Sequence, residues 1–241
     1  MPSFFVFLTA ENEPSMSSLF IKYIQNEPQC AKDQNLNRIC YMILPDGVKK
    51  GLAEGLGRLS ERYGISIVVI EEVNWNDDLT PWPADGVFRK AKPFGGKATA
   101  FLKKLANEII PEAEEHLGVV GAERTFLGVS LSGLFAVWSA FSTDVFTNII
   151  SISGSLWYDG FTLWMKENKL SDSVESVCLL LGDREQHSKE KRMATVLEQT
   201  QTAADILKRQ SVGSVVFELV EGTHFSPLMP RLEKAFGIVF G

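Results

Sequence analysis

The sequence has few cysteines and no long apolar run. Cysteine occurs only at Cys30, Cys40 and Cys178, an odd number with no CxxC spacing and no neighbouring histidine, so neither a disulfide scaffold nor a zinc site is indicated. Cys40 and Cys178 lie in apolar runs, and we expect both to be buried thiols in a reducing compartment. No window approaches the roughly 20 apolar residues that cross a bilayer, and the apolar stretch Phe4–Leu8 has no basic residue ahead of it. We therefore expect a soluble, cytoplasmic protein with no membrane partner.

Positive charge is also scarce. There are 24 Lys and Arg residues against 30 Asp and Glu residues, which gives a formal net charge of -6. Because binding to a nucleic-acid backbone normally needs a dense basic patch, no nucleic-acid partner is expected. The 241 residues are 45% apolar and 22% charged, which is enough to bury the core of an α/β domain. No repeat or linker divides the chain, so we expect a single domain over residues 1–241.

Short apolar runs alternate with longer segments of helical period. This pattern predicts crossover units and a mostly parallel central sheet with helices on both faces. Most predicted strands are near-continuous apolar runs, as strands buried on both faces should be. They are Phe4–Leu8, Ile39–Leu44, Ser66–Ile70, Thr125–Val129, Asn148–Ile152, Val177–Leu181 and Val215–Leu219. The predicted helices are Val48–Tyr63, Lys97–His116, Gly133–Phe141, Ser188–Gln210 and Pro230–Phe236.

One segment has neither period. Residues 74–96 include Trp75, Trp82, three prolines and several glycines, which predicts a long irregular loop. Loops of this length inside a compact domain are usually functional or mobile. The segment is therefore either a cover for the active site or a surface excursion held down by its two tryptophans.

The most specific local pattern is Gly-x-Ser-x-Ser-Gly at residues 128–133, between an apolar strand and an apolar helix. A nucleophile elbow requires this strand–turn–helix context. A serine in a strained turn raises its hydroxyl above the sheet, and small neighbours let the strand and helix approach closely. Ser130 is thus a candidate nucleophile, and the N–H of Leu131 would point at a developing oxyanion. The alternative is an ordinary strand-to-helix turn.

A serine nucleophile needs a base, and the sequence has three histidines. His116 ends a charged helical segment and His187 precedes a polar helix start, so we expect both near solvent. His224 follows the last predicted strand, where side chains converge at the carboxyl ends of a parallel sheet. His224 is therefore the candidate base, with a hydrogen-bonded loop histidine as the alternative.

The third member of a triad would be a carboxylate that orients His224. Asp183 and Glu185 both follow the predicted strand Val177–Leu181, and either would complete the chain order serine, acid, histidine. A metal site built from Asp183, His187 and His224 matches no familiar ligand spacing. The glycines near residues 51–57 lie inside a predicted helix and are not a dinucleotide fingerprint. No metal and no cofactor are expected.

Several blocks together resemble a known family. Residues 128–136 and 152–158 resemble the Gly-x-Ser-x-Gly-Gly-Leu and Ser-Pro-Ser-x-Trp-Trp blocks of one esterase branch of the α/β-hydrolases. That branch contains the trilactone siderophore esterases, S-formylglutathione hydrolases and feruloyl esterases. Asp78–Pro81, Phe101–Pro111 and Gly222–His224 resemble further blocks of it. The resemblance covers the chain from about Cys40 to Phe236 and implies an α/β-hydrolase fold and a serine esterase.

The resemblance also implies roles for particular residues. The family often has its acid at the fourth position of a Gly-x-x-Asp/Glu stretch, which falls on Glu185, although some siderophore esterases work with a serine–histidine dyad. Its second oxyanion donor lies in a turn after an early strand, which implies the backbone near Asp46 and Gly47. Ser132 stands where the family has glycine, and Gly154 where it has proline.

These observations predict a carboxylic ester hydrolase that acts on a small-molecule ester through an acyl-enzyme on Ser130. Trp75, Trp82 and Trp157 are candidate walls of an aromatic acyl or alcohol pocket, with core packing as the alternative. A noncatalytic hydrolase-fold protein that binds a ligand or partner is the alternative from another class. A thioesterase or acyltransferase would use the same residues, and no oligomeric state is predicted.

Overall fold

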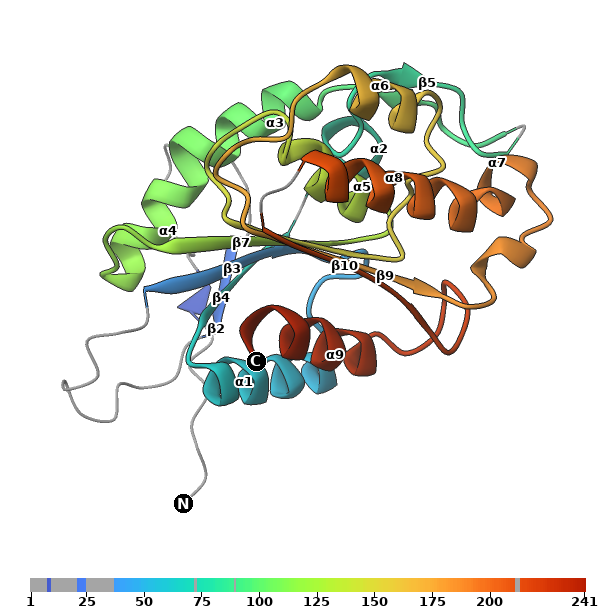
Figure 1. Cartoon of the computed structure of the whole chain (residues 1–241). Coiled ribbons are helices and arrows are strands. Elements are labelled where there is room, and N and C mark those ends of the chain that lie inside the picture. Colours follow the sequence, from blue (N-terminus) through green and yellow to red (C-terminus); the bar gives the residue numbers. More distant parts are fainter. Residues whose placement is uncertain (1–7, 10–20, 25–36, 72, 89, 211–212) are drawn as a thin grey trace.

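A computed structural model describes residues 8–9, 21–24, 37–71, 73–88, 90–210 and 213–241 (Figure 1). The strands are β1 Leu8–Thr9, β2 Ile21–Ile24, β3 Arg38–Ile43, β4 Ser66–Ile70, β5 Pro83–Ala84, β6 Phe94–Gly95, β7 Glu123–Val129, β8 Asn148–Ile152, β9 Ser176–Gly182 and β10 Ser214–Val220. The α-helices are α1 Lys50–Tyr63, α2 Trp75–Asp78, α3 Ala98–Lys104, α4 Ile110–Leu117, α5 Leu131–Ser139, α6 Phe161–Glu167, α7 Lys191–Ala194, α8 Val196–Gln210 and α9 Met229–Phe240.

The central sheet has the strand order β1-β2-β4-β3-β7-β8-β9-β10. The strands from β4 to β10 in that order run parallel, and β1 and β2 add antiparallel pairs at one edge. The prediction of a mostly parallel sheet is confirmed, and β4 and β8 have the predicted bounds. Of the predicted strand Phe4–Leu8, only Leu8 lies within the described residues, as the start of β1.

Helices cover both faces of the sheet (Figure 1). One hydrophobic core joins α3, α4, α5, α6 and α8 to side chains such as Tyr41 and Phe126. The other joins α1 and α9 to Met42 and Leu127, the next residues along the same two strands. Because successive side chains of a strand point to opposite faces, burial on both faces explains the near-continuous apolar runs. None of the described helices is long and apolar enough to cross a membrane.

Two of the predicted helices are interrupted. The segment predicted as Lys97–His116 consists of α3, a π-helical turn over Leu105–Ile109, and α4. Pro111 lies at the start of α4, and its missing N–H removes one hydrogen bond from a continuous α-helical ladder. The segment predicted as Ser188–Gln210 is divided at Thr195 into α7 and α8. Short elements that the sequence did not predict are β2, α6 and, within residues 74–96, α2, β5 and β6.

The predicted buried thiols are confirmed for Cys40 and Cys178, which are free and buried. Burial raises the pKa of the Cys178 thiol to about 12, so it stays protonated at neutral pH. Cys30 lies outside the described residues.

The strand register brings five loops to one edge of the sheet. Gly128 pairs with Ile43 of β3, Val129 pairs with Ile152 of β8, and Gly182 pairs with Val220 of β10. Because these parallel strands end at similar heights, the segments that follow them lie close together. The segments carry Gly47, Ser130, Ser153, Glu185 and His224.

Candidate active site

Ser130 occupies a sharp turn between β7 and α5. Its backbone has φ 62° and ψ −119°, a conformation that non-glycine residues rarely adopt. The turn is tight enough that a Cβ at position 128 would lie 1.9 Å from the Ser132 carbonyl oxygen, so Gly128 cannot be replaced without moving the backbone. Leu131 begins α5, and its N–H has no acceptor within the helix. This geometry presents both a hydroxyl and a free backbone donor above the sheet.

Ser132, which stands where the family has glycine, is fully buried in this turn. Its hydroxyl oxygen accepts a hydrogen bond from the Val129 N–H at 2.7 Å. The same hydroxyl oxygen lies 2.7 Å from the Ile43 carbonyl oxygen and 2.8 Å from the Val129 carbonyl oxygen. Either carbonyl can accept the hydroxyl proton. The serine therefore fits the elbow, and it links the end of β7 to the end of β3.

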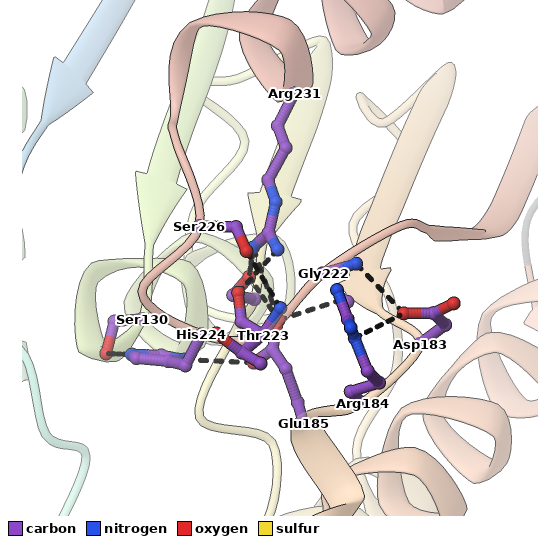
Figure 2. Close-up of polar contacts among 11 residues, drawn as sticks. Ser130, Asp183, Arg184, Glu185, Gly222, Thr223, His224, Ser226 and Arg231 are labelled. Carbon is purple, nitrogen blue, oxygen red and sulfur yellow. Dashed lines mark hydrogen bonds and ion pairs between the residues drawn. The ribbon is translucent and has the colours of Figure 1, made fainter.

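His224 lies between Ser130 and Glu185 (Figure 2). Its Nε2 is 3.0 Å from the Ser130 hydroxyl oxygen, and its Nδ1 is 2.9 Å from Glu185 Oε2. The His224 side chain is 25% exposed, whereas that of Glu185 is 4% exposed. The imidazole is thus open to a substrate while its acidic partner is shielded from water.

The Glu185 carboxylate is buried but well supplied with donors. Oε1 accepts hydrogen bonds from the Gly182 N–H at 2.8 Å and the Ser153 hydroxyl at 2.7 Å. Burial alone raises the pKa of this carboxyl, but the hydrogen bonds from His224, Ser153 and Gly182 more than offset it, so the pKa of Glu185 is lowered. Glu185 therefore carries its negative charge beside the imidazole at neutral pH.

Asp183, which the sequence offers as the alternative acid, contacts the backbone of Gly222 and not His224. It accepts a hydrogen bond from the Gly222 N–H at 2.9 Å, and Arg184 Nε lies 3.7 Å from the same oxygen. Its side chain is half-exposed. Figure 2 shows Asp183 on the far side of Gly222 from His224. Asp183 thus fastens the loop that carries His224, whereas Glu185 contacts the imidazole itself.

The turn after β3 lies on the opposite side of Ser130 in the strand order. Gly47 has φ 62°, and its N–H donates to the Leu44 carbonyl at 3.3 Å, longer than most backbone hydrogen bonds. The next N–H, of Val48, donates to Glu71 Oε1 at 3.0 Å, and Glu71 is paired with Lys22 at 2.8 Å. Glu71 therefore fixes this turn through the Val48 N–H, while the Gly47 N–H is held only by its long bond to Leu44.

The three tryptophans have different surroundings. Trp75 and Gly47 line a cavity of about 170 Å³ over the ends of β3 and β4. Trp157 lines a cavity of about 480 Å³ between α6 and α7, and the Arg192 guanidinium lies over its ring. Trp82 lines neither of these two cavities; its indole N–H donates to the Asp159 carbonyl, and it packs on neighbouring aromatic rings. Trp75 and Trp157 thus each line a cavity, whereas Trp82 is held by ring packing and by its hydrogen bond to Asp159.

The other two histidines are exposed, as expected from the sequence. The His116 ring stacks on Tyr23 with ring centroids 4.3 Å apart, and His187 ends the short 3-10 turn that begins at Glu185. Among the described residues, no group of three or more His, Cys, Asp or Glu side chains is placed to hold a metal ion. The side chains that meet at this site are a serine hydroxyl, an imidazole and a carboxylate.

Sequence reasoning did not single out three residues that hold this site together. Ser153 has φ 51° and bonds Glu185, Arg231 contacts both of them, and Glu71 holds the turn at Gly47. For Ser153 a weak signal existed, because it lies in the block at residues 152–158 that resembles the family. Nothing in the local pattern marks Arg231 or Glu71, because their partners are distant in the sequence.

The fold and the elbow place the protein in the α/β-hydrolase class. Within that class, the family described as "Putative esterase" matches residues 49–224 of this chain. The chain therefore belongs to that family. The resemblance seen in the sequence is confirmed.

The chain is similar to proteins from several organisms. The uncharacterized protein YbbA of Bacillus subtilis (strain 168) is 29% identical over 147 residues, which cover 60% of this chain and 59% of YbbA. Siderophore hydrolase EstB from Aspergillus nidulans has a TM-score of 0.70 at 19% identity and covers 92% of this chain and 90% of its own. An IroE-like serine hydrolase from Shewanella oneidensis has a TM-score of 0.73 at 20% identity, and the match covers 92% of this chain and 76% of that hydrolase. At such identities these structures show a shared fold.

Proposed function

We propose that this protein hydrolyses carboxylic esters through a Ser130–His224–Glu185 triad and an acyl-enzyme on Ser130. The observation that carries the proposal is the continuous chain of contacts from the Ser130 hydroxyl through both imidazole nitrogens to the Glu185 carboxylate. Each distance is within the range in which a base and its orienting group work.

In the acylation step, Ser130 Oγ attacks the ester carbonyl carbon while His224 Nε2 accepts the hydroxyl proton. Glu185 Oε2 accepts the hydrogen bond from the Nδ1–H, which selects the tautomer with a free Nε2 and stabilises the imidazolium that forms. The imidazolium then donates its proton to the leaving alkoxide, and the alcohol departs. The ester oxygen–carbonyl bond is broken and an acyl–Ser130 bond is formed.

The tetrahedral oxyanion needs preorganised donors. The Leu131 N–H at the start of α5 supplies the first, and the turn after β3 supplies the second through Gly47. The long bond from the Gly47 N–H to Leu44 can be exchanged for a bond to the oxyanion at little cost. Each such donor in comparable sites contributes about 3 kcal/mol to the transition state.

Deacylation repeats the same proton transfers with water as the nucleophile. Neutral His224 Nε2 removes a proton from water, the hydroxide attacks the acyl carbon, and Ser130 recovers its proton as the carboxylic acid leaves. The same residues would transfer the acyl group to another acceptor, or cleave a thioester. Hydrolysis of oxygen esters is the function that the family membership favours.

The substrate is expected to be a small-molecule ester whose acyl and alcohol parts extend toward opposite sides of Ser130. The Trp75 cavity lies over β3 and β4, on one side of β7, and the Trp157 cavity follows β8 on the other side. Because EstB, which has the same fold, is described as a siderophore hydrolase, siderophore esters belong in the panel of test substrates.

The test is a fluorophosphonate label combined with a panel of p-nitrophenyl esters, thioesters and siderophore esters. We expect one equivalent of label on Ser130, ester turnover, and neither in the Ser130→Ala variant. Labelling and turnover that persist in Ser130→Ala would contradict the proposal. A folded protein that takes up no label and hydrolyses no substrate of the panel would instead support a noncatalytic binding protein.

A further inference from the structure

Arg231 is a buried cation in contact with Glu185. It lies in the first turn of α9, and its side chain is only 5% exposed. Nη1 donates to the Ser153 hydroxyl oxygen at 2.5 Å and lies 3.3 Å from Glu185 Oε1, while Nη2 donates to the Thr223 carbonyl at 2.6 Å (Figure 2). A buried guanidinium is costly unless it is paired, so these contacts fix its position.

These contacts join the two loops that carry the acid and the base. Thr223 immediately precedes His224, and Glu185 follows β9, so one guanidinium restrains both ends of the hydrogen bond between them. Ser153, in its strained conformation with φ 51°, relays the contact from Arg231 to Glu185. The structure thus contains a support for the triad that is independent of Asp183.

The position of this charge also affects proton binding. A positive charge beside Glu185 competes with an imidazolium for the same carboxylate and so disfavours protonation of His224. The other charged groups nearby are either paired or exposed to water. Asp183 bonds the Gly222 N–H and is near Arg184, Lys234 of α9 is paired with Glu218 of β10, and Glu221 is exposed at the start of the His224 loop. Among the described residues, Arg231 is the non-titrating cation in contact with Glu185.

We propose that Arg231 is a positioning residue that clamps the His224 loop to Glu185 and, through its charge beside that carboxylate, disfavours the imidazolium form of His224. This inference rests on the proposed function for its catalytic meaning. The structural claim, that the Arg231 charge controls proton uptake by His224, can be measured without any substrate.

The test is an NMR titration of the histidine side chains in ¹⁵N-labelled protein, with His224 assigned from a His224→Gln variant. In Arg231→Met, which removes the charge but keeps an apolar stem, we expect the His224 titration to move upward by at least about half a pH unit. The acid limb of kcat/KM for p-nitrophenyl butyrate should move by the same amount. Arg231→Lys keeps the charge and should restore the midpoint of the His224 titration. Its kcat should still be lowered, because one ammonium group cannot reach the Ser153, Glu185 and Thr223 oxygens together.

Lys234→Met is the matched control. It removes a cation from the next turn of the same helix, where Lys234 is partly exposed and paired with Glu218, and it should leave the His224 midpoint unchanged. If Arg231→Met does not fold, Arg231→Gln offers a neutral side chain with a donor for Thr223 and should show the same upward shift.

A His224 titration that is the same in Arg231→Met or Arg231→Gln as in the parent would overturn the inference, whether or not the protein hydrolyses esters. An equal shift in Lys234→Met would also overturn the inference, because the shift would then result from the change in net charge and not from the contact between Arg231 and Glu185. A shifted titration in a protein without Ser130-dependent hydrolysis would leave the inference standing and remove the proposed function.

Discussion

On the acid–base side of Ser130, the Glu185 carboxylate accepts three hydrogen bonds of 2.7 to 2.9 Å and is 4% exposed. On the oxyanion side, the Gly47 N–H is held by a single bond of 3.3 Å beside a cavity of about 170 Å³. In the proposed mechanism, the first side is fixed before a substrate arrives, and the Gly47 N–H exchanges its bond to Leu44 for one to the substrate. Changes on the acid–base side should therefore lower kcat strongly, while changes on the oxyanion side should have smaller effects.

The largest effect is expected at the junction of the two sides. Ser130→Ala should lower kcat by at least about 10⁴-fold with the fold intact, because the nucleophile is lost from a turn that accepts a small side chain. Ser132→Ala is the matched control. It should keep kcat within about tenfold while lowering the free energy of unfolding by about 1–3 kcal/mol, because the buried Val129 N–H loses its acceptor. An inactive Ser132→Ala variant together with an active Ser130→Ala variant would show that Ser130 is not the nucleophile.

The next effect separates the two carboxylates on the acid–base side. Glu185→Gln should lower kcat by at least about 10²-fold, because the amide cannot stabilise the imidazolium as the carboxylate does. Asp183→Asn keeps an oxygen for the Gly222 N–H and should change kcat only a few-fold. Steady-state kinetics of the two variants decides between them. Near-normal rates for both would leave a Ser130–His224 dyad as the working machinery.

The pH dependence gives a third distinction. Only neutral His224 accepts the serine proton, so kcat/KM should fall by at least about tenfold as the pH is lowered from 8 to 5. The pKa of Glu185 is lowered, so this carboxylate should add no second limb in that range. An acid limb with a slope of two, in which a second group titrates above pH 5, would show that Glu185 is not held as the structure indicates.

The same lowered pKa has a consequence for stability. A carboxyl whose folded pKa lies below its unfolded value of about 4.3 stabilises the fold above that pH, and the contribution is lost as the pH falls through the folded pKa. Urea unfolding of the parent and Glu185→Gln should therefore give midpoints that converge below about pH 4. A gap that stays constant down to pH 3 would contradict the assigned direction.

The smallest effect is expected on the oxyanion side. In Gly47→Ala the new Cβ would lie 2.7 Å from Glu71 Oε1 at a φ of 62°, so we expect kcat to fall by about tenfold and stability by about 1–2 kcal/mol. Gly51→Ala is the control, because nothing lies within 4 Å of its Cβ and it sits in α1, where alanine is favoured. Equal kinetics for the two variants would remove Gly47 from the site.

The comparison also explains what could be predicted from the sequence. The strands β4 and β8 were predicted with their observed bounds because burial on both faces gives apolar runs with clear ends. The four-residue strand β2 and the short α6 have too few residues for a period to be recognised. The helical period predicts one helix through Pro111, although in the structure Pro111 lies in the first turn of a new helix after a π-helical turn.

At the site, the candidates were found because each follows a strand in the order serine, acid, histidine. The choice between Asp183 and Glu185 remained open because both follow the same strand, and only the three-dimensional path of the loop shows that Glu185 contacts His224. Arg231 was not predicted at all. Its partners are 8 to 78 residues away in the sequence, so no local pattern marks it.

The most direct measurement of the central claim is trapping of the acyl-enzyme during turnover. Rapid acid quench of the enzyme with p-nitrophenyl butyrate, followed by peptide mass spectrometry, should find one butyryl group on the peptide that carries Ser130. Glu185→Gln should reach the same adduct more slowly, and Ser130→Ala should show none. Steady turnover with a butyryl group on another residue, or with no adduct under conditions where deacylation limits the rate, would contradict the triad.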